Sequence, residues 1–67
     1  MKYNVGDLIL ETCFKYQKDY SLYYITWADE QHVELLHHAS NNKHVYDVKS
    51  IDRWIERNNA KHYPVSK

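Results

Sequence analysis

Five histidines and one cysteine are the side chains of this 67-residue chain that could ligate a transition metal: Cys13, His32, His37, His38, His44 and His62. If the segment between them turns back, His38 and His44 would approach each other, with Cys13 or Asp47 as a third ligand. Zinc sites take four ligands at short spacings such as C-x2-C or H-x3-H, and neither spacing occurs here. The adjacent His37 and His38 would also point to opposite faces of a strand. We therefore predict no metal site, and expect histidines that face solvent or are hydrogen bonded, with pH sensitivity as a milder alternative.

Catalytic groups are also sparse. Nucleophilic catalysis needs an activated side chain beside a base, and Cys13, between Thr12 and Phe14, is typical of a small residue packed in a strand. The single glycine excludes a glycine-rich phosphate loop, and Asp29 and Glu30 fall in a predicted turn. The sequence predicts that the protein is not an enzyme and contains no cofactor-binding motif.

Aromatic side chains are abundant, with seven tyrosines, two tryptophans and one phenylalanine. This is more than one small core needs, and tyrosine and tryptophan are enriched at protein interfaces. The polar segment Lys15–Ser21 holds Tyr16 and Tyr20, and loops positioned by a rigid sheet often carry function. We predict an interaction surface there, anchored by Tyr16, Tyr20 and Tyr23, with Tyr46, Arg53 and Arg57 as further candidates. The alternative is that the loop tyrosines cover one end of the core.

The charges balance overall but are unevenly distributed. Five basic side chains face eight acidic ones up to Asp52, whereas four face one from Arg53 onward. Phosphate neutralisation dominates nucleic-acid affinity, so a net charge of zero favours a protein partner. Binding of single-stranded nucleic acid by exposed tyrosines and the basic C-terminal segment is the alternative.

The cellular location is predicted from two features that the sequence lacks. No apolar run approaches the length of a membrane span, and the polar N-terminus lacks the pattern of a secretory signal. We expect a cytoplasmic protein without membrane contact.

Hydrophobic patterning predicts a mostly β, single domain over residues 1–67. Alternation of apolar residues and runs of β-branched and aromatic residues indicate strands over 7–14, 22–29, 32–38 and 44–48. Turns are predicted at Gly6-Asp7, before the first strand, and at Asn41-Asn42, between the last two, because glycine and asparagine tolerate positive φ. Ile51, Trp54 and Ile55 form an apolar stripe that indicates a helix over 51–59, with Ser50 as its N-cap and Asn58-Asn59 as its stop. We expect Trp54 and Ile55 to pack on the sheet as part of the core. An extended tail follows over 62–66, where Pro64 disfavours helix. Four to five short strands and one C-terminal helix predict a small antiparallel barrel, or a strongly curled sheet with the helix across its open end.

Two stretches resemble known families. Residues 3–9, YNVGDLI, resemble the first strand of SH3-like barrels, in which a glycine–aspartate pair opens the barrel. Residues 51–55, IDRWI, and 62–65, HYPV, resemble the ends of small accessory proteins encoded by bacteriophages. The resemblance covers about a third of the chain, and it implies a cytoplasmic protein that binds a host protein and has no catalytic residues. It implies no site residue.

Overall fold

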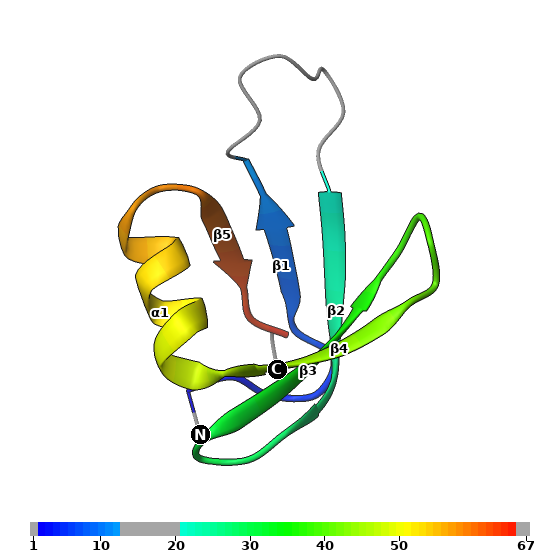
Figure 1. Cartoon of the computed structure of the whole chain (residues 1–67), viewed down its shortest axis with the longest axis horizontal. Coiled ribbons are helices and arrows are strands. Elements are labelled where there is room, and N and C mark those ends of the chain that lie inside the picture. Colours follow the sequence, from blue (N-terminus) through cyan, green and yellow to red (C-terminus); the bar gives the residue numbers. More distant parts are fainter. Residues whose placement is uncertain (1, 13–20, 66–67) are drawn as a thin grey trace.

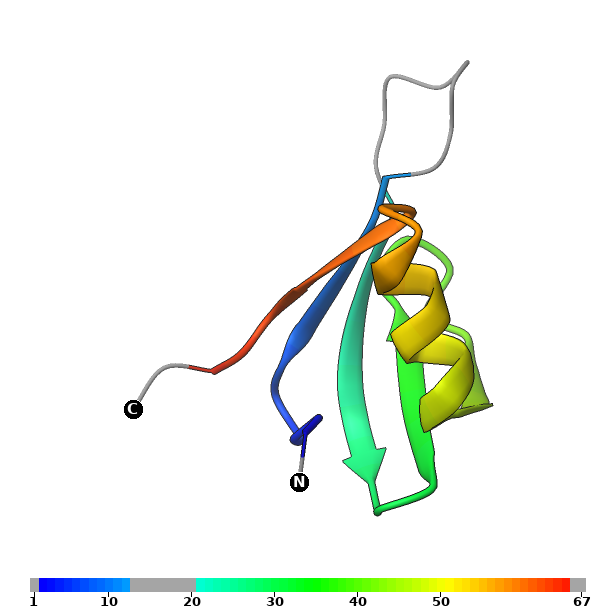
Figure 2. The ribbon, with the colours of Figure 1, turned by 90° about the vertical axis from the view of Figure 1, so that its left-hand side faces the viewer.

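The computed structural model describes residues 2–12 and 21–65, which form one antiparallel sheet and one helix (Figure 1). The elements in chain order are β1 (Leu8–Glu11), β2 (Ser21–Ala28), β3 (His32–His37), β4 (Lys43–Asp47), α1 (Val48–Glu56) and β5 (Ala60–Tyr63). The five strands follow the order β4-β3-β2-β1-β5. Figure 2 shows α1 lying on one side of this sheet. The mostly β fold with one helix is confirmed, and the sheet is open rather than closed into a barrel.

The predicted strands are confirmed with small shifts at their ends. β2 and β4 each start and end one residue earlier than predicted, and β3 ends one residue earlier. β1 is shorter than predicted, and residues 13 and 14 lie outside the described part of the chain. The predicted turn residues act as expected. Asn41 adopts a left-handed φ of 61°, and the Asp29 carboxylate accepts hydrogen bonds from the N–H groups of Gln31 and His32 at 2.8 and 2.6 Å.

The helix begins three residues earlier than predicted, so the assignment of Ser50 as N-cap was wrong. Asp47 occupies the N-cap position in an extended conformation, and its side chain makes no capping hydrogen bond. The reason lies in the sheet: the N–H of Val48 donates to the carbonyl of Gln31 at 2.9 Å, at the end of the β3–β4 ladder. One of the free N–H groups at the helix start is thus satisfied by the segment that precedes β3, and α1 can follow β4 without a linker.

The end of the helix is set by Asn58, as the sequence indicated, although the last helical residue is Glu56 rather than residue 59. Asn58 has a φ of 59°. The N–H of Asn58 donates to the carbonyl of Ile55, and that of Asn59 to the carbonyl of Trp54. This pair of bonds is a Schellman motif. It turns the chain directly into β5, which therefore starts at Ala60 rather than within the predicted tail over 62–66.

The core lies between α1 and the sheet face that it covers. Its buried side chains come from all strands except β4, from the helix and from the N-terminal segment: Tyr3, Ile9, Ile25, Val33, Leu35, Ile51 and Ala60. Trp54 and Ile55 pack against this cluster half-buried. The predicted apolar stripe of the helix is therefore confirmed as the surface that docks on the sheet.

A buried carboxylate joins the two ends of the described chain. Asp7, 1% exposed, accepts hydrogen bonds from the N–H of Asn4 (3.0 Å), from Nε2 of His62 (2.8 Å) and from the N–H of Val65 (2.9 Å). The preceding Gly6 has a φ of +96°, and a Cβ there would lie 3.1 Å from Cγ2 of Val65. Glycine alone tolerates this backbone easily. We call Gly6, Asp7, His62 and Val65 the latch.

Candidate functional site

Four of the six predicted binding residues line one cavity of about 370 Å³ between α1 and the sheet. Tyr23 comes from β2, Tyr46 from β4, and Arg53 and Arg57 from α1 and its C-terminal end. The other lining residues are Glu11, Ser50, Ile51, Trp54 and Asn59. We call this cavity the cleft. The remaining two predicted anchors, Tyr16 and Tyr20, lie outside the described residues.

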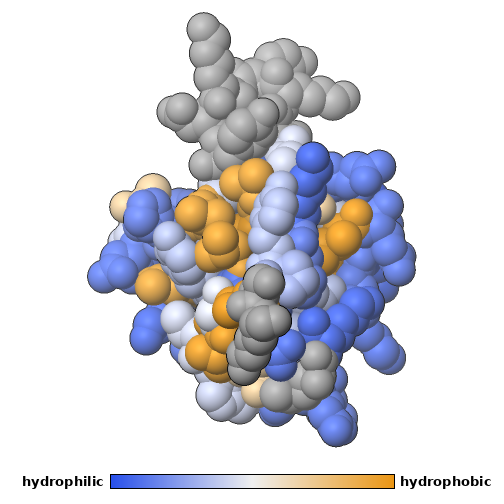
Figure 3. Space-filling model, turned by 180° about the vertical axis from the view of Figure 1, so that it is seen from behind, coloured by the Kyte–Doolittle hydropathy of each residue, from blue (hydrophilic) through white to orange (hydrophobic). Residues whose placement is uncertain are grey.

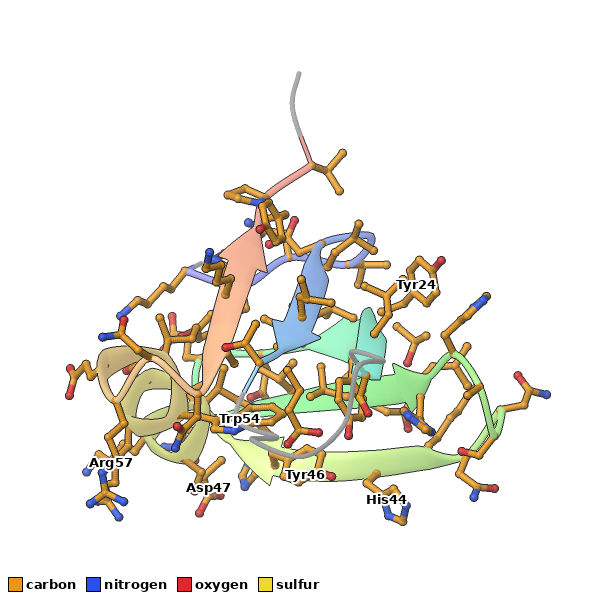
Figure 4. All side chains as sticks on the ribbon, turned by 90° about the horizontal axis from the view of Figure 1, so that it is seen from above. Tyr24, His44, Tyr46, Asp47, Trp54 and Arg57 are labelled. Atoms are coloured by element: carbon orange, nitrogen blue, oxygen red, sulfur yellow. The ribbon has the colours of Figure 1, made fainter. Side chains whose placement is uncertain are left out.

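Strand register places the tyrosines of the cleft. Tyr46 pairs with Val33, whose side chain is buried on the helix side of the sheet, so Tyr46 faces the same side. Tyr23 points to this side as well, because its ring lies edge-on to Trp54 with centroids 5.8 Å apart. Figure 4 shows Tyr46 and Trp54 close to each other between β4 and α1, with Arg57 on the outer side of the helix.

The aromatic wall of the cleft is partly a wall of the core. Tyr23 packs against the hydrophobic cluster, and the centroid of its ring lies 4.9 Å from that of the His37 ring. Its hydroxyl donates to Oε1 of Glu11 at 3.5 Å. Tyr46 is more open, with 36% of its surface exposed. Tyr46 is therefore the tyrosine of the cleft that a ligand can reach most easily, and Tyr23 is its supporting wall.

The rim of the cleft is cationic. Arg53 and Arg57 are exposed and one helical turn apart, so their guanidinium groups project from the same flank of α1. Neither forms an ion pair with a carboxylate in residues 2–12 and 21–65. Two arginines in this arrangement can bind a carboxylate or a phosphate through charge-assisted hydrogen bonds.

The histidines are distributed over the fold. The ring of His38 lies against Tyr24, which faces away from the helix, whereas the ring of His44 lies against Tyr46 on the helix side. The juxtaposition of His38 and His44 considered from the sequence is thus not formed. In the part of the chain that the structure describes, no three His, Cys, Asp or Glu side chains are grouped so that they could hold a metal ion.

Asp52 on α1 is held in a network with the N-terminal segment. The hydroxyl of Tyr3 donates to Oδ1 of Asp52 at 2.5 Å, and the ammonium of Lys2 lies 2.9 Å from the same oxygen. These two contacts lower the pKa of Asp52. Burial, together with the hydrogen bond to Asp52, raises the pKa of Tyr3 far above its ordinary value. This network holds the N-terminal segment on the helix.

Two features that bear on binding were not predicted from the sequence. Trp54 was assigned to the core alone, yet it also lines the cleft. In addition, the sheet face turned away from α1 is apolar, with half-buried side chains on three adjacent strands: Leu8, Leu10, Leu22, Tyr24 and Leu36. Figure 3 shows apolar residues on this side of the molecule between polar ones at its margins. The alternating residues of β1 and β2 are apolar on both faces, and this was the signal available in the sequence.

In the part of the chain that the structure describes, no helix is both long and apolar enough to span a membrane.

Comparisons with models of protein families, with curated proteins and with solved structures give no match for this chain.

Proposed function

We propose that this protein is a non-catalytic protein-binding module and that the cleft is its contact surface. The observation that carries the proposal is the pair of exposed arginines without ion-pair partners, in the described part of the chain, beside an aromatic cavity. Leaving two like charges one turn apart on a helix is mildly unfavourable, which is easier to understand if a ligand supplies the missing negative charge.

The cleft suits a segment of a partner protein that combines an apolar or aromatic side chain with a carboxylate. The apolar group would lie against Trp54 and Tyr46, and the carboxylate would bind Arg53 and Arg57. Anchors of this kind, tryptophan, tyrosine and arginine, contribute most of the binding energy at many interfaces.

We also make a proposal about the curvature of the sheet and about the origin of the protein. We propose that the sheet is curled in the manner of an SH3-like barrel, because α1 contacts both β4 and β5, the two edges of the sheet. The sequence resemblance to bacteriophage accessory proteins supports a host protein in the cytoplasm as the partner.

Single-stranded nucleic acid is the second candidate ligand. Tyr46 and Trp54 could stack bases, while Arg53 and Arg57 would bind phosphates. Glu11 in the wall of the cleft and a net charge of zero disfavour it.

The test is a pull-down from lysate with mass spectrometry, performed with and without nuclease, that compares matched variants. We expect Tyr46→Ala to reduce capture of a specific protein at least tenfold, about 1.4 kcal/mol. The control Tyr63→Ala removes a similarly exposed tyrosine from β5 that does not line the cleft. Arg53→Gln/Arg57→Gln should act like Tyr46→Ala.

Three outcomes separate the hypotheses. Equal capture by both tyrosine variants would contradict the role of the cleft. Loss of all specific capture after nuclease treatment, together with steep weakening by salt, would favour nucleic acid. Capture that resists nuclease and moderate salt supports a protein partner.

A further inference from the structure

The strand β4 is an open edge of the sheet. It pairs with β3 on one side, no described strand pairs with its other side, and all five of its residues are exposed. Figure 4 shows it at the margin of the molecule. Natural proteins usually protect such edges by keeping the strand short or with charged side chains, proline, a bulge or a covering element. Of these, β4 has its short length and the charges of Lys43 and Asp47. β4 contains no proline, and its pairing with β3 is regular from Lys43 to Asp47.

The hydrogen bonds at the two ends of the β3–β4 ladder identify the outward backbone groups. The carbonyl of Asn42 and the N–H of Val48 bond to the β3 side. Backbone groups alternate in direction every second residue of an antiparallel strand, so residues 44 and 46 also face β3. The N–H and C=O groups of Lys43, Val45 and Asp47 therefore face outward. Val45 has 58% of its surface exposed.

We propose that two copies of this chain associate through β4, antiparallel to each other, with a two-fold axis beside Val45. In this register each outward residue meets an outward residue of the second copy. The two Val45 residues exchange both backbone hydrogen bonds, and Lys43 of each copy lies opposite Asp47 of the other. The edge is thus self-complementary in charge, which is what an isologous interface requires.

The side chains fit the same register on both faces. Lys43, Val45 and Asp47 share the face turned away from α1, where the Asp47 side chain is 69% exposed and lies 3.3 Å from His32. On the other face His44 of one copy meets Tyr46 of the second. Cross-strand pairs of opposite charge and of aromatic rings stabilise a sheet.

Neighbouring registers are less favourable. A shift by two residues in one direction places Val45 opposite Asp47 and brings Lys43 opposite Lys49. A shift in the other direction places Val45 opposite Lys43 and leaves both ion pairs unformed. A shift by one residue puts outward backbone groups opposite inward ones, so the hydrogen bonds are lost. The register centred on Val45 is the one that satisfies both the backbone and the charges.

The interface is small, since it rests on the five residues of β4 in each chain, so we expect a reversible dimer whose population rises with protein concentration. Sedimentation equilibrium of the full chain over a concentration series measures this directly. Lys43→Asp and Asp47→Lys should each be monomeric, because like charges then meet across the axis. A mixture of these two variants should associate again, since the edge of the first variant is acidic at both ends and that of the second is basic at both ends.

A backbone variant gives an independent test. Val45→Pro removes the outward N–H of the central pair, and proline is tolerated in an edge strand where that N–H faces solvent. It should abolish association, whereas the control Val45→Thr should retain it. Circular dichroism and thermal melting verify that each variant is folded. If Val45→Pro fails to fold, the charge variants and their mixture still decide the question.

The proposal is overturned if the natural sequence remains monomeric at every concentration. It is also overturned if the mixed charge variants associate no more than each alone, or if folded Val45→Pro still dimerises.

Discussion

The latch and the cleft use charged side chains in opposite ways. In the latch, Asp7 is buried and its carboxylate accepts three hydrogen bonds, two of them from groups far along the chain. In the cleft, Arg53 and Arg57 are exposed and form no ion pair in the described part of the chain. A saturated buried charge fixes a fold, whereas an exposed unpaired charge remains available for a partner. The two regions therefore predict opposite responses to mutation.

The largest expected effect is on the latch. Asp7→Ala should destabilise the folded state by about 3–5 kcal/mol, because it leaves His62 and two backbone N–H groups without their acceptor in a buried site. Chemical denaturation with urea measures this loss. Asp29→Ala is the matched control, since Asp29 also accepts two backbone N–H bonds but is exposed. If both variants lose the same small amount, the latch contributes no more than an ordinary turn.

Low pH should destabilise the folded state by a smaller amount than Asp7→Ala. Burial by itself raises the pKa of Asp7, but the hydrogen bonds from Val65, His62 and Asn4 outweigh it and lower the pKa below its usual value. A carboxylate whose pKa is lower in the folded than in the unfolded state stabilises the protein above its unfolded pKa, about 4. That stability is lost as the pH falls through the folded value.

The melting temperature should therefore decrease below about pH 4, and this decrease should be shallower in Asp7→Asn than in the natural sequence. Asp29 and Asp52, whose pKa values are also lowered by hydrogen bonds, contribute to the remaining slope. Parallel curves for the two proteins would show that the latch carboxylate is not among the groups that acid disrupts.

The smallest expected effect is that of the two cleft arginines on the stability of the folded state. Arg53→Gln/Arg57→Gln should change the free energy of unfolding by less than about 0.5 kcal/mol, because surface substitutions without buried partners rarely do more. Thermal melting at neutral pH measures it. A loss of about 2 kcal/mol or more, in the range of buried mechanisms, would mean that the arginines hold the fold together and would remove the contrast with the latch.

The sequence predicted local structure better than it predicted which distant segments come into contact. Alternation in β1, the apolar stripe of α1 and the helix stop at Asn58 follow from side chains a few positions apart. The helix start did not, because the group that satisfies Val48 is a carbonyl of Gln31 on another segment. The start of β5 at Ala60 likewise depends on pairing with β1, which the small side chain of alanine does not signal.

The candidate site shows the same division. Tyr23, Tyr46, Arg53 and Arg57 were selected one by one for their chemistry, but only the register of β2, β3 and β4 brings them to one cavity. Asp7 was expected in a turn, and its burial could not be foreseen, because its partners His62 and Val65 are 55 and 58 positions away.

That separation has a consequence for how the protein is made. β1 lies between β2 and β5, so it is synthesised long before β5, one of its two neighbours. At about 5–20 residues per second, the ribosome needs roughly 3–10 seconds to proceed from Thr12 to Val65. Throughout that interval the edge of β1 that faces β5 has no partner strand, and the Asp7 carboxylate lacks its hydrogen bonds from His62 and Val65. The fold can therefore be completed only after translation of Val65, and a ribosome stalled before this point would display an incomplete sheet to chaperones and proteases.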